Sequence, residues 1–131
     1  MSGARAQCAL TRAISFYARH RYAGHGPQGD HGHLYRVEVS VAGAIDAARQ
    51  HVIDLDALDN LLTEAVSQPL AGRHLNEAIP EFASGEQLPT CEAIAVWCWQ
   101  QLAPRLPSDT RLQRVRVAED AGLWADCTGV D

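Results

Sequence analysis

The chain has 131 residues, a formal charge of −5 at pH 7 and an apolar fraction of 47%. This length suits one domain, residues 1–131, with a single core, and the sequence holds no run of 18 apolar residues that would predict a membrane span. The acidic balance without a basic run argues against nucleic acid as a partner. The N-terminus lacks the apolar stretch of a signal peptide, so we expect a cytoplasmic protein.

The basic side chains are all arginine, because the chain contains no lysine. A lysine Schiff base and a P-loop lysine are therefore excluded as mechanisms. The cysteines, Cys8, Cys91, Cys98 and Cys127, are widely spaced and form no C-x-x-C pair. We expect them to be free thiols with structural roles.

Two strands are predicted in the first third of the chain, over residues 8–20 and 33–43, with a loop rich in Gly, Pro and Asp at 21–30. The second strand alternates clearly between polar and apolar side chains. One face would hold Leu34, Arg36, Glu38 and Ser40, and the other Tyr35, Val37, Val39 and Val41.

Two helices are predicted next. The first begins at Asp54 as N-cap, ends near Pro69 and Gly72, and has an apolar stripe of Leu55, Leu58, Leu62, Ala65 and Val66. The second begins at Thr90, ends at Pro104, and has a stripe of Ile94, Trp97, Cys98, Gln101 and Leu102. Strands over 111–120 and 122–129, joined by a turn at 120–122, complete a β-β-α-α-β-β order. This order predicts an α+β domain: a four-stranded antiparallel sheet with two helices on one face.

A histidine cluster is the main candidate for chemistry. His31 and His33 are two apart at the start of a strand, so both side chains point to one face. His20 ends the preceding strand, and a hairpin would bring it beside the pair. Three imidazoles with an open fourth position are typical of catalytic zinc, although copper and nickel also bind such ligands. We therefore predict Zn²⁺ at His20, His31 and His33, the alternative being that "HGH" forms a solvated turn.

The sequence also resembles a known family. "FYARH", "DHGHLYRVEV", "IDLDAL", "HLNEAIP", "PTCEAIAVWCWQQL" and "VRVAED" occur in the order found in the 6-pyruvoyl-tetrahydropterin synthase and 6-carboxy-tetrahydropterin synthase family. The resemblance extends from about residue 10 to 128 and implies a tunnelling fold, assembled into trimers and then hexamers with active sites between subunits. It implies the same element order that the periodicity predicts.

The resemblance implies roles for single residues. His20, His31 and His33 match the zinc ligands, and Glu119 matches the acid that anchors the pterin. A carboxylate can accept two parallel hydrogen bonds from the amino and ring N–H edge of a 2-amino-4-oxopyrimidine. Thr90 and Glu92 match a T-x-E motif near the pterin pocket, with a simple helix cap as the alternative reading.

The chain departs from the family at the proton-transfer groups. Pro27 stands at the position of the family's cysteine, four residues before the first histidine of "HGH". The family motif L-D-H-x-x-L-N reads "LAGRHLN" here, with Ala71 and Gly72 in place of the Asp and His. The candidate catalytic replacements are Asp30, His25 and His74, each of which is alternatively a solvated loop residue.

These observations predict a zinc-dependent enzyme with altered chemistry: a lyase, a cyclase or an aldehyde condensation on a small planar heterocycle such as a pterin. One alternative is a 6-carboxy-tetrahydropterin synthase with a rewired general base. Another is a non-catalytic paralogue that binds pterin or only forms oligomers. In each case the resemblance implies a homo-oligomer, a trimer or hexamer.

Overall fold

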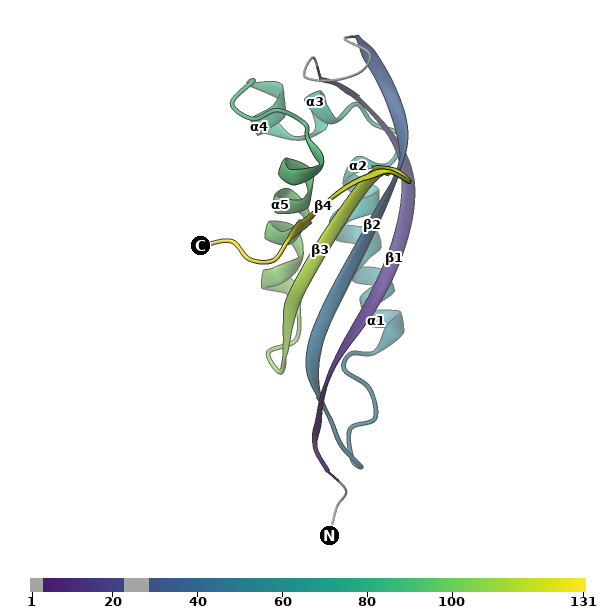
Figure 1. The fold of residues 1–131 in the computed structure, drawn as a ribbon, viewed down its shortest axis with the longest axis vertical. Helices are drawn as coiled ribbons and strands as arrows, with labels where there is room; N and C mark the ends of the chain where they lie inside the picture. Colours follow the sequence, from purple (N-terminus) through teal and green to yellow (C-terminus); the bar gives the residue numbers. More distant parts are fainter. Residues whose placement is uncertain (1–3, 23–28) are drawn as a thin grey trace.

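A computed structural model describes residues 4–22 and 29–131. Its strands are β1 (Ala6–Arg21), β2 (Asp30–Ile45), β3 (Thr110–Asp120) and β4 (Leu123–Cys127). They form one antiparallel sheet in the order β1-β2-β3-β4, with β1 and β2 running nearly the length of the molecule (Figure 1). The predicted α+β class and four-stranded antiparallel sheet are confirmed.

The β1–β2 ladder is longer than the sequence predicts, and β2 begins at Asp30, so that both histidines of "HGH" lie within the strand. Tyr35, Val37 and Val39 are fully buried while Leu34 is 67% exposed, which confirms the predicted faces. Ser40 is an exception, since it is buried although it lies on the polar face. A β-bulge between β2 and β3 falls next to it, and its hydroxyl lies 2.7 Å from that of Thr11.

The first helical segment runs as α1 (Leu55–Leu62), a π-helical turn (Thr63–Ser67) and α2 (Gln68–Leu70). Asp54 is the N-cap, and its carboxylate accepts from the Ala57 amide at 2.9 Å. The helix ends at Leu70, between the predicted Pro69 and Gly72, and Pro69 itself lies inside α2. Proline has no N–H and crowds the carbonyl four residues earlier, and the widened π turn before it accommodates both effects. Leu55 is half exposed and outside the buried stripe.

The second long helix is α5 (Cys91–Leu102), followed by a 3₁₀ turn (Ala103–Arg105). Thr90 caps it, since its hydroxyl accepts from the Ala93 amide at 3.1 Å. Cys91 and Ala95 are buried in this helix, whereas the predicted stripe members Trp97 and Gln101 are only half-buried. Two short helices that the sequence analysis missed, α3 (Leu75–Ala78) and α4 (Pro80–Ala83), lie near the end of the molecule where β1 meets β2 (Figure 1).

The helices pack on one face of the sheet, and the apolar side chains of that face and of the helices form one core. Burial of these side chains removes apolar surface from water and is the main stabilising contribution to the fold. Within the described ranges, no helix is long and apolar enough to span a bilayer.

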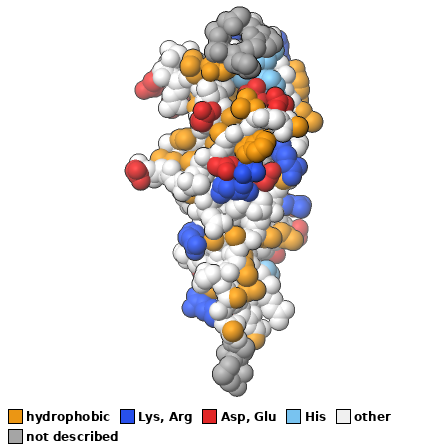
Figure 2. Space-filling view, in the orientation of Figure 1, with side chains coloured by type: hydrophobic (Ala, Val, Ile, Leu, Met, Phe, Trp, Pro, Cys, Tyr) orange, Lys and Arg blue, Asp and Glu red, His pale blue; other side chains and the backbone are white. Residues whose placement is uncertain are grey.

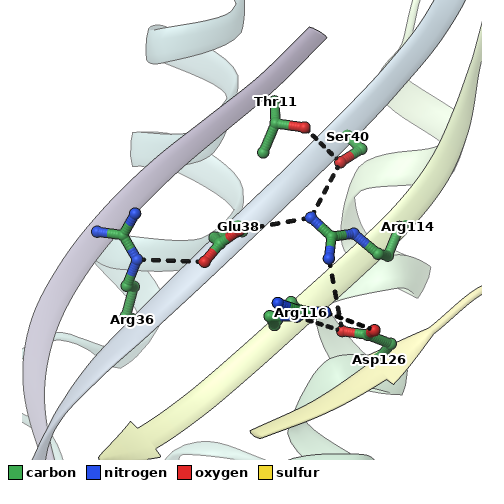
Figure 3. A network of polar contacts seen from close by, with 7 residues as sticks. All are labelled: Thr11, Arg36, Glu38, Ser40, Arg114, Arg116 and Asp126. Carbon is green, nitrogen blue, oxygen red and sulfur yellow. Dashed lines mark hydrogen bonds and ion pairs between the residues drawn. The ribbon is translucent and has the colours of Figure 1, made fainter. Parts of the chain in front are cut away.

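The opposite face of the sheet carries a polar network that crosses all four strands (Figure 3). Glu38 accepts from Arg36 at 3.3 Å and from Arg114 at 3.4 Å, and Asp126 accepts two hydrogen bonds from Arg116 at 2.7 and 3.1 Å. Blue and red side chains accordingly gather near the middle of the face seen in Figure 2. The sheet therefore has one apolar face under the helices and one charged face without helices.

Candidate functional site

The three predicted metal ligands meet on the helix-covered face of the β1–β2 ladder. His20 and His31 are direct cross-strand partners, and His33 pairs with Ala18, two residues further along the ladder. The Nε2 atom of His20 lies 3.0 Å from that of His31 and 3.2 Å from that of His33. Ligands at tetrahedral angles around zinc, with Zn–N bonds of about 2.0–2.1 Å, would stand about 3.3 Å apart. The spacing therefore fits a three-histidine metal centre.

The surroundings of His20 and His31 orient both rings for metal binding. The Nδ1 atom of His20 donates to the Pro89 carbonyl at 3.1 Å, and that of His31 donates to the Gly29 carbonyl at 2.9 Å. Each ring therefore carries its proton on Nδ1 and presents the Nε2 lone pair to the other. Two lone pairs at this distance repel unless a cation lies between them, so the donor set itself favours a metal.

Burial supports the same protonation state at His20. This side chain is 1% exposed, and burial lowers its pKa, with the neighbouring imidazoles acting in the same direction. The Tyr35 hydroxyl is also buried and lies 3.2 Å from His20 Nδ1. The hydroxyl oxygen and the Pro89 carbonyl therefore both accept from the Nδ1–H group of His20. A neutral imidazole is the form that ligates a metal.

Glu119, the predicted substrate acceptor, lies at the edge of this centre. Its Oε2 atom is 3.1 Å from His33 Nε2, and its Oε1 atom accepts from the Cys91 thiol at 3.4 Å. Burial, followed by the charge of Glu119, raises the pKa of Cys91 to about 12. The thiol therefore acts at neutral pH as a hydrogen-bond donor rather than as a thiolate nucleophile.

A cavity of about 540 Å³ adjoins the carboxylate. Its lining contains all three predicted substrate-binding residues, Glu119, Thr90 and Glu92. The sequence analysis missed the rest of the lining: Tyr22, Cys91, Asp120, Gly122 and Leu123. The cavity has room for a small heterocycle, and its lining contains the carboxyl groups of Glu92, Glu119 and Asp120.

Two of the three proposed catalytic replacements contact each other. His74 Nε2 lies 3.2 Å from Asp30 Oδ1, and the hydrogen bond from His74 lowers the pKa of Asp30, with Arg21 acting in the same direction. Asp30 flanks His31 along β2, so strand alternation assigns its side chain to the opposite face of the sheet from the histidine cluster. His25 and Pro27 fall outside the described residues.

The segment around Ala71 and Gly72 has a structural explanation. Gly72 follows α2 with φ = +72°, and its amide donates to the Tyr17 carbonyl at 2.7 Å. A left-handed residue directly after a helix favours glycine over residues with a Cβ atom. The turn places residues 72–76 along the free edge of β1, where Arg19 forms a bridge with His74.

The fold and the site together define a class: α+β proteins with an antiparallel sheet, a cluster of three histidines and an adjacent acidic cavity. Residues 9–130 match the family described as 6-pyruvoyl tetrahydropterin synthase. The chain belongs to this family.

Several relatives agree with this assignment. The chain is 36% identical to the human 6-pyruvoyl tetrahydrobiopterin synthase, with 89% of this chain and 88% of the human one covered. It is 32% identical to a dihydroneopterin monophosphate aldolase of Pyrococcus furiosus, over 68% of this chain and 69% of that one. The structure of the Caenorhabditis elegans 6-pyruvoyl tetrahydropterin synthase superposes with a TM-score of 0.80 at 22% identity, covering 95% of this chain and 97% of that one.

Proposed function

We propose that the chain is a zinc-dependent lyase or cyclase of pterin metabolism whose chemistry differs from that of the usual synthases. One observation carries the proposal: the Glu119 carboxylate lies 3.1 Å from His33, where the cavity meets the metal centre. A planar 2-amino-4-oxopyrimidine held by this carboxylate would extend its substituent toward the histidines. Relatives named as a pterin synthase and as an aldolase support this class of substrate and leave the reaction open.

The residues that line the cavity would each have a separate role in binding the substrate. Glu119 accepts the N–H edge of the heterocycle, while Thr90 and Glu92 line the cavity at the start of α5. Tyr22 offers an aromatic ring to the same space. His20, His31 and His33 would hold Zn²⁺, which would supply a Lewis acid for a substrate carbonyl or hydroxyl oxygen.

Proton transfer is assigned to the pair of Asp30 and His74, with His25, which lies outside the described residues, as the remaining candidate. A carboxylate accepts only, so Asp30 fixes the proton of His74 on Nε2 and leaves a lone pair on Nδ1. This Nδ1 atom is buried and has no hydrogen-bond partner among the described residues. His74 also lines a cavity of about 300 Å³ with Arg73 and Glu77. An oriented imidazole is a usual general base, and for His74 to act as one its buried lone pair must become open to the substrate in the assembled oligomer.

The proposed site requires a homo-oligomer, a trimer or hexamer. The pair and the histidine cluster belong to opposite faces of the sheet, so the pair would act on a substrate held by a neighbouring copy. Apolar side chains on the helix-free face support association, because Leu34 is 67% and Trp124 49% exposed there. The resemblance to a family with active sites between subunits points the same way.

The experiment is a product assay of the purified protein with dihydroneopterin triphosphate, dihydroneopterin monophosphate and aldehyde-plus-amine pairs, each with zinc or with a chelator. Turnover that needs zinc and is lost in Glu119→Gln is expected, whereas the exposed control Glu86→Gln should behave as wild type. Equal turnover with zinc and with chelator would remove the metal from the mechanism. The product formed separates an altered reaction from a 6-carboxy-tetrahydropterin synthase with a rewired base.

A further inference from the structure

His33 stands between the metal centre and the substrate cavity and has contacts on both sides through one atom. Its Nε2 is 3.2 Å from His20 Nε2 and 3.1 Å from Glu119 Oε2. A ring nitrogen offers either one N–H or one lone pair at a time. His33 can therefore present Nε2 to a metal or to Glu119, and not to both.

The other two histidines lack this choice. Carbonyl groups of Pro89 and Gly29 fix the proton of His20 and of His31 on Nδ1, so their Nε2 atoms remain available to a metal. Among the described residues no such carbonyl holds the Nδ1 atom of His33. The group that faces Nε2 therefore decides which ring nitrogen of His33 carries the proton. The centre consists of two ligands with a fixed tautomer, His20 and His31, and of His33, whose tautomer can change.

Glu119 has one donor on each of its two oxygens when no metal competes. Its Oε1 atom accepts from Cys91 at 3.4 Å, and its Oε2 atom accepts from His33 at 3.1 Å. A heterocycle that bonds both oxygens therefore shares Oε2 with His33, and an oxygen that already accepts one hydrogen bond is a weaker acceptor for a second. Cys91 is buried in α5 and is not one of the predicted metal ligands, so the contact that metal binding can release is the one with His33.

We propose that His33 couples the two halves of the site: metal binding removes its hydrogen bond from Glu119 and so frees Oε2 for the substrate. The coupling rests on the proposed function for its ligand class, a 2-amino-4-oxopyrimidine. Because coupling between two sites is reciprocal, the heterocycle must also strengthen metal binding. Coupled sites typically change each other's affinity by about 5- to 150-fold.

The test compares two variants that each lose a metal ligand. Binding of pterin (2-amino-4-oxopteridine) is measured by isothermal titration calorimetry to wild type with zinc, to metal-free wild type, and to metal-free His33→Ala and His31→Ala. Both variants lack a complete metal centre, but only His33→Ala releases Glu119. We expect zinc-loaded wild type and metal-free His33→Ala to bind tightly, and metal-free wild type and His31→Ala to bind at least about 5-fold more weakly.

Equal affinity of the two metal-free variants would overturn the coupling, as would a wild-type affinity that zinc leaves unchanged. Failure of every form to bind pterin would instead refute the proposed substrate class. The His33–Glu119 contact is then read directly by ¹⁵N NMR of histidine-labelled, metal-free protein. The Nε2–H tautomer of His33 in wild type, lost in Glu119→Ala, supports the link, and an Nδ1–H tautomer in wild type refutes it.

Discussion

His74 donates from Nε2 to Asp30 at 3.2 Å, although the two residues are 44 positions apart in the sequence. The contact forms because residues 72–76 lie along the free edge of β1, beside the hairpin that carries Asp30. It brings together a carboxylate and an imidazole close to Ala71 and Gly72, the positions where the resemblance places the family's Asp and His.

If the pair transfers the proton, His74→Ala should lower kcat by about 10²- to 10⁴-fold, the usual contribution of a general base. Asp30→Asn should have a smaller effect, since it leaves the imidazole but no longer fixes its tautomer. Pterin affinity should stay unchanged, because neither residue lines the cavity beside Glu119. His51→Ala, at an exposed histidine far from the pair in sequence, is the control.

Mixed oligomers test whether the pair serves a neighbouring copy. Chains with His74→Ala and chains with Glu119→Gln, each inactive alone, should recover about a quarter of wild-type activity when refolded together in equal amounts, because each shared site draws one half from each chain. No recovery, in oligomers shown by mass spectrometry to be mixed, would place both groups in the site of one chain.

Zinc should stabilise the folded protein through the histidine centre. A metal that binds only the folded state raises the free energy of unfolding by about 2.7 kcal/mol when its free concentration is 100 times its Kd. Differential scanning fluorimetry should show a rise in Tm with zinc for wild type and for His51→Ala. The rise should be absent in His31→Ala, and a normal rise in that variant would place the metal elsewhere.

The buried thiols should resist alkylation at neutral pH. Burial raises the pKa of Cys91 and of Cys98 to about 12, in the case of Cys91 with a contribution from Glu119. The thiolate is the reactive form, so both remain unmodified in the folded protein. Peptide mass spectrometry after iodoacetamide treatment should find Cys8, which is partly exposed, modified first. Modification of Cys91 as fast as Cys8 would contradict the hydrogen-bonded thiol.

The ion pair between Arg116 and Asp126, on the charged face of the sheet, should contribute to the free energy of unfolding in a pH-dependent way. Hydrogen bonds from Arg116 lower the pKa of Asp126 in the folded protein. The pair therefore stabilises the fold above the carboxyl group's unfolded pKa of about 3.9, and this contribution is lost as the pH falls through the lower folded value. Asp126→Asn should lower Tm by a few degrees at most at pH 7, because the pair is partly exposed. In urea denaturation the difference from wild type should shrink below pH 4; a constant difference would indicate a packing effect.

Much of the fold follows from local sequence pattern. Alternation along residues 33–41 assigns Tyr35 and Val37 to the core, because strand side chains alternate between faces. The same rule puts His31 and His33 on one face, and the hairpin adds His20 as a direct partner. Helix caps at Asp54 and Thr90 are equally local, since each side chain accepts from a backbone amide three residues on.

Local rules gave less detail where tertiary packing adds to them. The helix ends at Leu70, as Pro69 and Gly72 predict, but a π turn before Pro69 accommodates its missing N–H. The short helices α3 and α4 were missed because four residues are too few to show a helical period.

The sequence by itself determined the sheet, its two faces and the three histidines, because these depend on residues close together in the chain or directly paired in a hairpin. Only the tertiary structure decided which other groups meet them. The contacts of Glu119 with His33 and of His74 with Asp30 join segments that no periodicity relates. They arise from the placement of β3 beside β2 and of the segment after α2 beside β1. They add an acceptor and a candidate base to the histidine cluster.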